Sequence, residues 1–144
     1  MTGVQTCALP IFTLDFAHVL YADEMPAFAA MLINRHSRLL GVHLNDGYGK
    51  RDDGLMVGSV HPVQTIELLH VLDKMSYSGA IYFDTFPDIT GLDPIHECAT
   101  NINTVEALKR IAKKLLGNEK LDQAILKQDA VTSQTIIQAA IYGI

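Results

Sequence analysis

The stretch RLLGVHL, residues 38–44, decides the fold class of this 144-residue chain. It is mostly apolar and lacks the alternation of polar side chains, which is typical of a strand covered on both faces. Two further strand-like runs lie on either side of it, FTLDF at 12–16 and GAIYFD at 79–84. Helical patterns separate the three runs. Strands that alternate with helices of this length predict βαβ units and a parallel sheet.

The helices are predicted from apolar residues that recur every three or four positions. In the first, Pro26 stands in the opening turn, where proline is tolerated. Gly117 ends the longest one as a C-cap residue. The expected helices are residues 25–34, 62–74, 94–116, 121–128 and 132–142.

Composition excludes several classes of protein. The chain is 49% hydrophobic and 19% charged, with a mean hydropathy of +0.18, as expected for a folded globular protein. Its net charge of −5 and scattered basic residues argue against nucleic acid as a partner. No apolar run approaches the roughly 20 residues of a membrane-spanning helix. Two cysteines, Cys7 and Cys98, make no disulfide framework, so we expect a reduced, cytoplasmic setting.

The first eleven residues, MTGVQTCALPI, are set apart from the rest. They have the apolar middle of a signal peptide but neither a basic n-region nor a small-residue cleavage site. They also resemble the translation of a common sequencing-library adapter. We therefore expect the natural sequence to begin near Phe12 and exclude residues 1–11 from functional argument. Residues 12–116 then form the βα units, and residues 117–144 form a helical extension.

Each predicted strand ends in candidate metal ligands: Asp15 with His18, His43 with Asp46, and Asp84. In parallel α/β folds the ligand site lies outside the carboxyl ends of the strands. Neighbouring strands lie about 4.8 Å apart, so these side chains can converge on one cation. Carboxylates with imidazoles suit Mn²⁺, Mg²⁺ or Co²⁺, and the lack of paired cysteine ligands disfavours structural zinc.

Each candidate also has a purely structural interpretation. Asp15 would cap the turn that follows it, and His18 would be a buried, hydrogen-bonded histidine. Asp46 precedes a glycine, and its interpretation as a turn residue is favoured over a metal ligand. The acidic residues of the 45–58 loop would only expose their charges to solvent. Asp84 is hardest to explain structurally, because a carboxylate that ends an apolar run is costly unless it is paired or metal-bound.

The loop HLNDGYGKRDDGLMVGS, residues 43–59, resembles the seventh-strand segment of the xylose-isomerase-like barrels. These include xylose isomerase, L-rhamnose isomerase and the ketose 3-epimerases. In that superfamily the sixth strand supplies an acid and, three positions on, a histidine, which correspond to Asp15 and His18. The seventh strand supplies His43, and its loop supplies Asp52 before a Leu-x-x-Gly motif. The eighth strand supplies Asp84.

The resemblance implies a divalent metal (Mn²⁺, Mg²⁺ or Co²⁺) held by Asp15, His43 and Asp84, with a glutamate from the fourth strand outside this chain. It also implies a second, catalytic metal at His18 and Asp52. The residues expected to take part in catalysis are His18, Asp52 and Asp84. Gly54 stands where the isomerases often carry a second loop carboxylate, a place that Asp53 would have to fill.

The resemblance further implies an α/β fold, the C-terminal portion of a (β/α)8 barrel with about three βα units. The expected function is aldose–ketose isomerisation of a small sugar, by a homo-oligomer in the full-length form and with little activity in this fragment alone. An aspartate at position 84 favours this over a ketose 3-epimerase, which uses a glutamate there. Two alternatives stay open: a metal-dependent abasic-site endonuclease, which the net charge of −5 disfavours, and a non-catalytic fragment.

Overall fold

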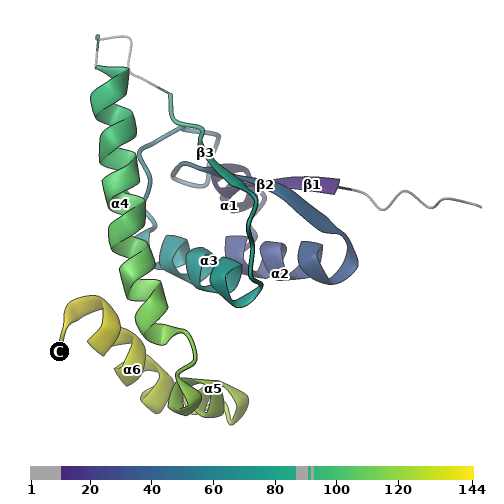
Figure 1. Ribbon diagram of the computed structural model, residues 1–144, viewed down its shortest axis with the longest axis vertical. Coiled ribbons are helices and arrows are strands. Elements are labelled where there is room, and N and C mark those ends of the chain that lie inside the picture. The colour runs from purple at the N-terminus through teal and green to yellow at the C-terminus, as the bar shows by residue number, and fades with distance from the viewer. Residues whose placement is uncertain (1–10, 87–90, 92) are drawn as a thin grey trace, which may run out of the picture.

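A three-stranded parallel sheet lies at the centre of the fold (Figure 1). The computed structural model describes residues 11–86, 91 and 93–144. Strands β1 (Ile11–Asp15), β2 (Arg38–Leu44) and β3 (Ala80–Phe83) are neighbours in that order, and both pairings are parallel. The α/β class and the three predicted strands are therefore confirmed. Residues 1–10, with Cys7, lie outside the described residues.

The first strand differs from its prediction at both ends. It begins at Ile11, which pairs with Arg38, so the expected boundary after residue 11 falls inside β1. It ends at Asp15, because Phe16 begins a helix that the sequence did not reveal, α1 (Phe16–Tyr21). Phe16 is completely buried in the core. A six-residue helix is too short to show the apolar periodicity on which the prediction depended.

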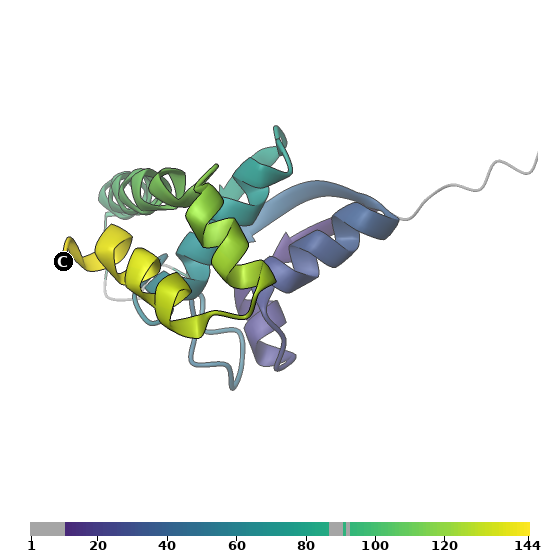
Figure 2. The same cartoon turned by 90° about the horizontal axis from the view of Figure 1, so that it is seen from below.

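The connecting helices α2 (Pro26–His36) and α3 (Pro62–Lys74) lie on the same face of the sheet (Figures 1 and 2). The buried side chains of Leu14, Val42 and Leu44 belong to one core with those of α3, including Leu69. On the opposite face Tyr82 is 55% exposed, and no helix of the described residues lies over it (Figure 1). The expectation that β2 is covered on both faces is therefore wrong within the described residues.

Three helices complete the described chain: α4 (Pro94–Leu115), α5 (Glu119–Leu126) and α6 (Ala130–Tyr142). Helix α4 packs along α3, and α6 packs against α4 and α5 (Figure 2). Gly117 adopts a φ of +71° after α4, as expected of a C-cap glycine. The last two helices begin two residues before their predicted starts, because Asn118 and Asp129 cap them through their side chains.

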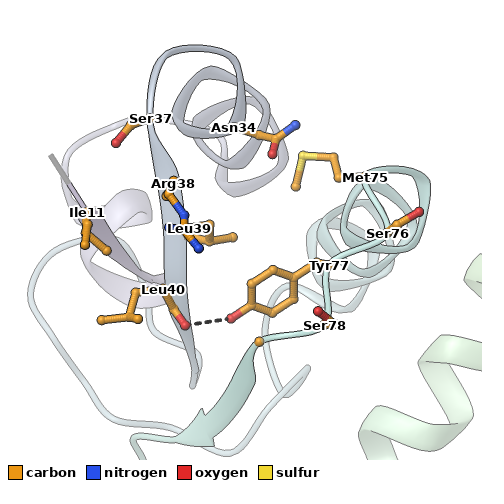
Figure 3. A pocket seen from close by; sticks show the side chains of 11 residues that line it. Ile11, Asn34, Ser37, Arg38, Leu39, Leu40, Met75, Ser76, Tyr77 and Ser78 are labelled. Carbon is orange, nitrogen blue, oxygen red and sulfur yellow. Dashed lines mark hydrogen bonds between the residues drawn. The ribbon is translucent and has the colours of Figure 1, made fainter. Parts of the chain in front are cut away.

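A cavity of about 490 Å³ lies at the amino ends of β2 and β3 (Figure 3). There the Tyr77 hydroxyl donates to the carbonyl oxygens of Leu40 and Ala80, at 3.3 and 2.9 Å. Among the described residues that line it, Arg38 is the one that carries a charge. This end of the sheet is opposite to the carboxyl ends, where the candidate ligands stand. This cavity is therefore not the candidate site.

None of the helices in the described residues is both long and apolar enough to cross a membrane.

Candidate metal centre

Three side chains from three adjacent strands meet at the carboxyl end of the sheet. Asp15 and His43 are register partners across β1 and β2, and Asp84 follows β3. His43 Nδ1 lies 3.4 Å from Asp15 Oδ2 and 3.1 Å from Asp84 Oδ2. One ligand atom from each residue lies within 4.8 Å of the others. The parallel register therefore brings together the three residues predicted as the first metal set.

The three residues are partly buried, and the imidazole is held in place. Side-chain exposure is 14% for Asp15, 36% for His43 and 41% for Asp84. The His43 ring meets the ring of Tyr82 edge to face, with centroids 5.7 Å apart. Asp84 is itself tied to the sheet, since its backbone N–H donates to the Leu44 carbonyl at 3.1 Å. The site opens on the face of the sheet that no described helix covers.

Asp15 combines the two roles that the sequence left open. Its Oδ1 accepts the backbone N–H of His18 at 3.0 Å, which makes Asp15 the N-cap of α1. Its Oδ2 points to His43. A carboxylate has enough lone pairs to serve both partners. The capping interpretation of Asp15 is therefore right, and it leaves one oxygen for the cluster.

His18 and Asp52 form a separate pair. His18 Nε2 lies 3.1 Å from Asp52 Oδ2, whereas neither residue belongs to the three-residue cluster found among the described residues. The His18 side chain is 62% exposed, so its interpretation as a buried histidine is wrong. The other oxygen of Asp52, Oδ1, is buried and lacks a hydrogen-bond partner within the described part of the chain. An orphaned buried carboxylate oxygen is what a cation would satisfy.

The pKa of His18 is raised above its usual value, first by the hydrogen bond to Asp52 and then by the negative charge of Asp15. Protonated His18 is thus favoured in the folded state, and this stabilisation is complete below the unfolded pKa of about 6.5. It is lost as the pH rises through the higher pKa of the folded protein.

We expect the Asp52→Asn variant to lower the pKa of His18, because it removes the charge that the imidazolium faces. NMR titration of the histidine ring protons measures this directly, with exposed His36 as the internal reference. The variant is also expected to be less stable than the unmodified protein at pH 6 and equally stable above the folded pKa. The expected change in stability is small, because solvent-exposed ion pairs contribute little to the free energy of unfolding. An unchanged His18 titration curve would contradict the pairing.

Asp53 is not available as the second loop ligand. Its Oδ2 accepts the Tyr48 backbone N–H at 2.8 Å, and its Oδ1 pairs with Arg51 Nε at 2.7 Å. The backbone hydrogen bond from Tyr48, followed by the one from Arg51, holds the pKa of Asp53 below its usual value. Asp53 therefore stabilises the conformation of the loop and does not replace the carboxylate that is absent at Gly54.

Asp46 is a structural residue, as the favoured interpretation held. It is completely buried, and its two oxygens accept hydrogen bonds from the backbone of Gly47, Val60 and His61 and face His61 Nδ1, each at 2.8 Å. Its backbone also exchanges two hydrogen bonds with Leu55. Asp46 thus joins the start of the 47–59 loop to its end and holds His61 at the N-cap position of α3.

Gly54 is required by the packing of the same loop. It adopts a φ of +57°, and a Cβ at this position would overlap the ring of Phe86. The Phe86 N–H also donates to the Gly54 carbonyl at 2.8 Å. These contacts fasten the loop that carries Asp52 to the segment that follows Asp84.

We expect Gly54→Ala to destabilise the fold by about 2–4 kcal/mol, because a positive φ and a steric overlap add together. Gly117→Ala is the matched control. Gly117 has a φ of +71°, and a Cβ at this position would meet no atom within 4 Å, so only the conformational cost of about 1 kcal/mol applies. Urea unfolding of both variants measures the difference. Equal losses would show that Phe86 does not restrict this position.

Asn45 is the residue that sequence reasoning missed. Its position after β2 places it among the turn residues of the loop, yet it is completely buried. It contacts Asp15 and the backbone of Ala17. The sequence contained one indication of this role. A polar residue that directly follows an apolar strand can be buried in the core together with the end of that strand.

The donor set fits a small divalent cation. Two ligands placed at right angles, each about 2.1 Å from a cation such as Mg²⁺, lie about 3.0 Å apart. The distances from His43 Nδ1 to Asp84 Oδ2 and Asp15 Oδ2, 3.1 and 3.4 Å, are close to this spacing. Two carboxylates with one imidazole suit Mn²⁺, Mg²⁺ or Co²⁺.

Comparison of the chain with protein-family models finds no match, and neither does comparison with curated proteins.

Proposed function

We propose that this chain forms part of a metal-dependent sugar isomerase that interconverts aldoses and ketoses. The observation that carries the proposal is the convergence of Asp15, His43 and Asp84 at the carboxyl ends of three adjacent parallel strands. Active sites of (β/α)8 barrels are built at this end of their strands. The same residues occupy the ligand positions in the motif that resembles the xylose-isomerase-like barrels.

The arrangement of layers is that of consecutive βα units in a barrel. The strands follow one another in space in chain order, and both connecting helices cover the same face (Figure 1). One half of a doubly wound sheet shares this order and covering, so the barrel is proposed from the motif at the strand ends. The proposal requires further βα units that pair with the open edges of β1 and β3 and supply the remaining ligands.

Within this proposal each residue has a defined task. Asp15, His43 and Asp84 would hold a divalent cation, which when bound polarises the carbonyl and hydroxyl oxygens of a sugar. His18 and Asp52 lie at the same end, since the Asp15 carboxylate accepts the His18 backbone N–H and Asp52 faces the His18 ring. His18 Nε2 faces Asp52 Oδ2, so this pair can hold a proton beside the open face of the sheet.

The proposal is tested on the protein encoded by the natural gene. Aldose–ketose conversion is followed over a panel of aldoses with added Mn²⁺, after exhaustive chelation, and after Mn²⁺ is restored. We expect conversion that disappears on chelation and returns with Mn²⁺. Conversion that survives chelation would contradict the metal mechanism. A gene that encodes no further βα units with a glutamate at the end of a strand would contradict the barrel.

A further inference from the structure

The side chain of Asn45 links the candidate metal cluster to the core. Asn45 follows β2 directly and is completely buried. Its Oδ1 accepts the backbone N–H of Ala17 at 2.9 Å, and its Nδ2 donates to Asp15 Oδ1 at 3.4 Å. A backbone N–H can only donate, so the amide oxygen must face Ala17. The amide NH₂ group is therefore turned toward the carboxylate of Asp15.

The two oxygens of the Asp15 carboxylate have different partners. Oδ1 accepts hydrogen bonds from the His18 backbone N–H and from Asn45 Nδ2. Oδ2 lies toward His43, 3.4 Å from Nδ1. Because Oδ1 is engaged by two donors, rotation of the carboxylate to present both oxygens to the cluster would break both bonds. Asp15 is thus oriented so that one oxygen, Oδ2, faces the cluster.

We propose that Asn45 is a positioning residue that restricts Asp15 to one-oxygen coordination and so makes the site favour Mn²⁺ and Mg²⁺ over Ca²⁺. The inference rests on the metal site of the proposed function. Ca²⁺ takes six to eight oxygens and commonly uses both oxygens of a carboxylate, whereas Mg²⁺ prefers six ligands in regular octahedral geometry. A carboxylate that can offer a single oxygen penalises the larger cation.

The test measures the affinities of the protein encoded by the natural gene for Mn²⁺, by electron paramagnetic resonance of the free ion, and for Ca²⁺, by competition against Mn²⁺. Asn45→Ala removes both contacts of the amide. We expect Mn²⁺ affinity to fall about 10- to 100-fold, as for loss of other partners that orient a metal ligand. Ca²⁺ affinity is expected to fall less. Asp15 Oδ1 loses one of its two donors and so becomes more available to Ca²⁺, which commonly uses both oxygens of a carboxylate. The preference for Mn²⁺ over Ca²⁺ therefore falls.

Asn45→Asp keeps the shape of the side chain and an oxygen for the Ala17 N–H, so it tests the proposal even if Asn45→Ala fails to fold. It replaces the NH₂ donor with a second acceptor and is also expected to shift the preference toward Ca²⁺. Asn101→Ala is the matched control. Asn101 is equally buried, and its Oδ1 accepts one backbone N–H, that of Val57 at 3.0 Å, without contacting the cluster.

The outcomes separate this inference from the proposed function. An unmodified protein from the natural gene that binds neither cation overturns both. A chain that binds Mn²⁺, with Asn45 variants that keep the same preference over Ca²⁺, overturns the role of Asn45 alone. An equal change of preference in Asn101→Ala overturns it too, because a general loss of stability then explains the effect. A reduced preference in both Asn45 variants, with Asn101→Ala unchanged, supports it.

Discussion

The Asp84→Ala variant is expected to lose Mn²⁺ binding, with a fall in affinity of at least about 100-fold. Loss of a side chain that merely orients a ligand costs roughly 10- to 100-fold, and loss of the ligand itself costs more. Asp84 supplies one of the three atoms that converge within 4.8 Å, so its removal leaves two ligands from two strands. His43→Ala is expected to have the same effect, because its Nδ1 lies next to both carboxylates.

Matched controls separate ligand loss from general changes of charge. Asp122→Ala removes an exposed aspartate on α5 that pairs with Lys74 at 3.4 Å, far from the carboxyl ends of the strands. His36→Ala removes an exposed histidine at the last residue of α2. Isothermal titration calorimetry with Mn²⁺ compares all four variants, each made in the protein encoded by the natural gene. If Asp84→Ala binds Mn²⁺ as tightly as Asp122→Ala does, the cluster is not a metal site.

The Asp46→Ala variant is expected to lose about 3–5 kcal/mol of unfolding free energy. Three buried or partly buried backbone N–H groups and the His61 ring lose their acceptor at once. Each donor left without a partner costs about 1–3 kcal/mol. Asp46 also places negative charge at the N-terminus of α3, where it is favourable. Both ends of the 47–59 loop are released together.

Two further variants distinguish this role from a simple loss of volume. His61→Ala removes one of the four partners and is expected to cost about 1 kcal/mol. Asp46→Asn keeps one acceptor oxygen but turns an NH₂ group toward donors, so its loss should fall between the other two. Urea unfolding followed by circular dichroism measures the series. A loss below about 1 kcal/mol in Asp46→Ala would mean that the loop does not depend on this carboxylate.

The strands and the longer helices were predictable because their signals are local. The apolar run of β2 and the spacing of Ile66, Leu69 and Leu72 in α3 appear within short windows of sequence. Helix α1 was not predictable in this way, since its N-cap, Asp15, had two interpretations and its six residues show no periodicity. The starts of α5 and α6 lie before their predicted positions because apolar periodicity does not reveal the capping residues.

The membership of the candidate site was partly predictable. Asp15, His43 and Asp84 come together because parallel strands in register align their carboxyl ends, a consequence of backbone pairing alone. Their convergence therefore followed from strand assignment. Which acidic residues of the loop have structural roles could not be predicted in this way. Asp46 and Asp53 accept hydrogen bonds from backbone N–H groups that only the folded loop brings close to them.

The sequence by itself determined the parallel α/β architecture and the three residues that end its strands, since periodicity and polarity are properties of short segments. The tertiary structure decided which oxygen atoms remain free. Asp15 Oδ1 is engaged by the neighbouring His18 backbone N–H and also by Asn45, 30 residues away. Asp52 reaches His18 across 34 residues. Contacts at such separations depend on how the loops fold onto the sheet, and no local pattern encodes them.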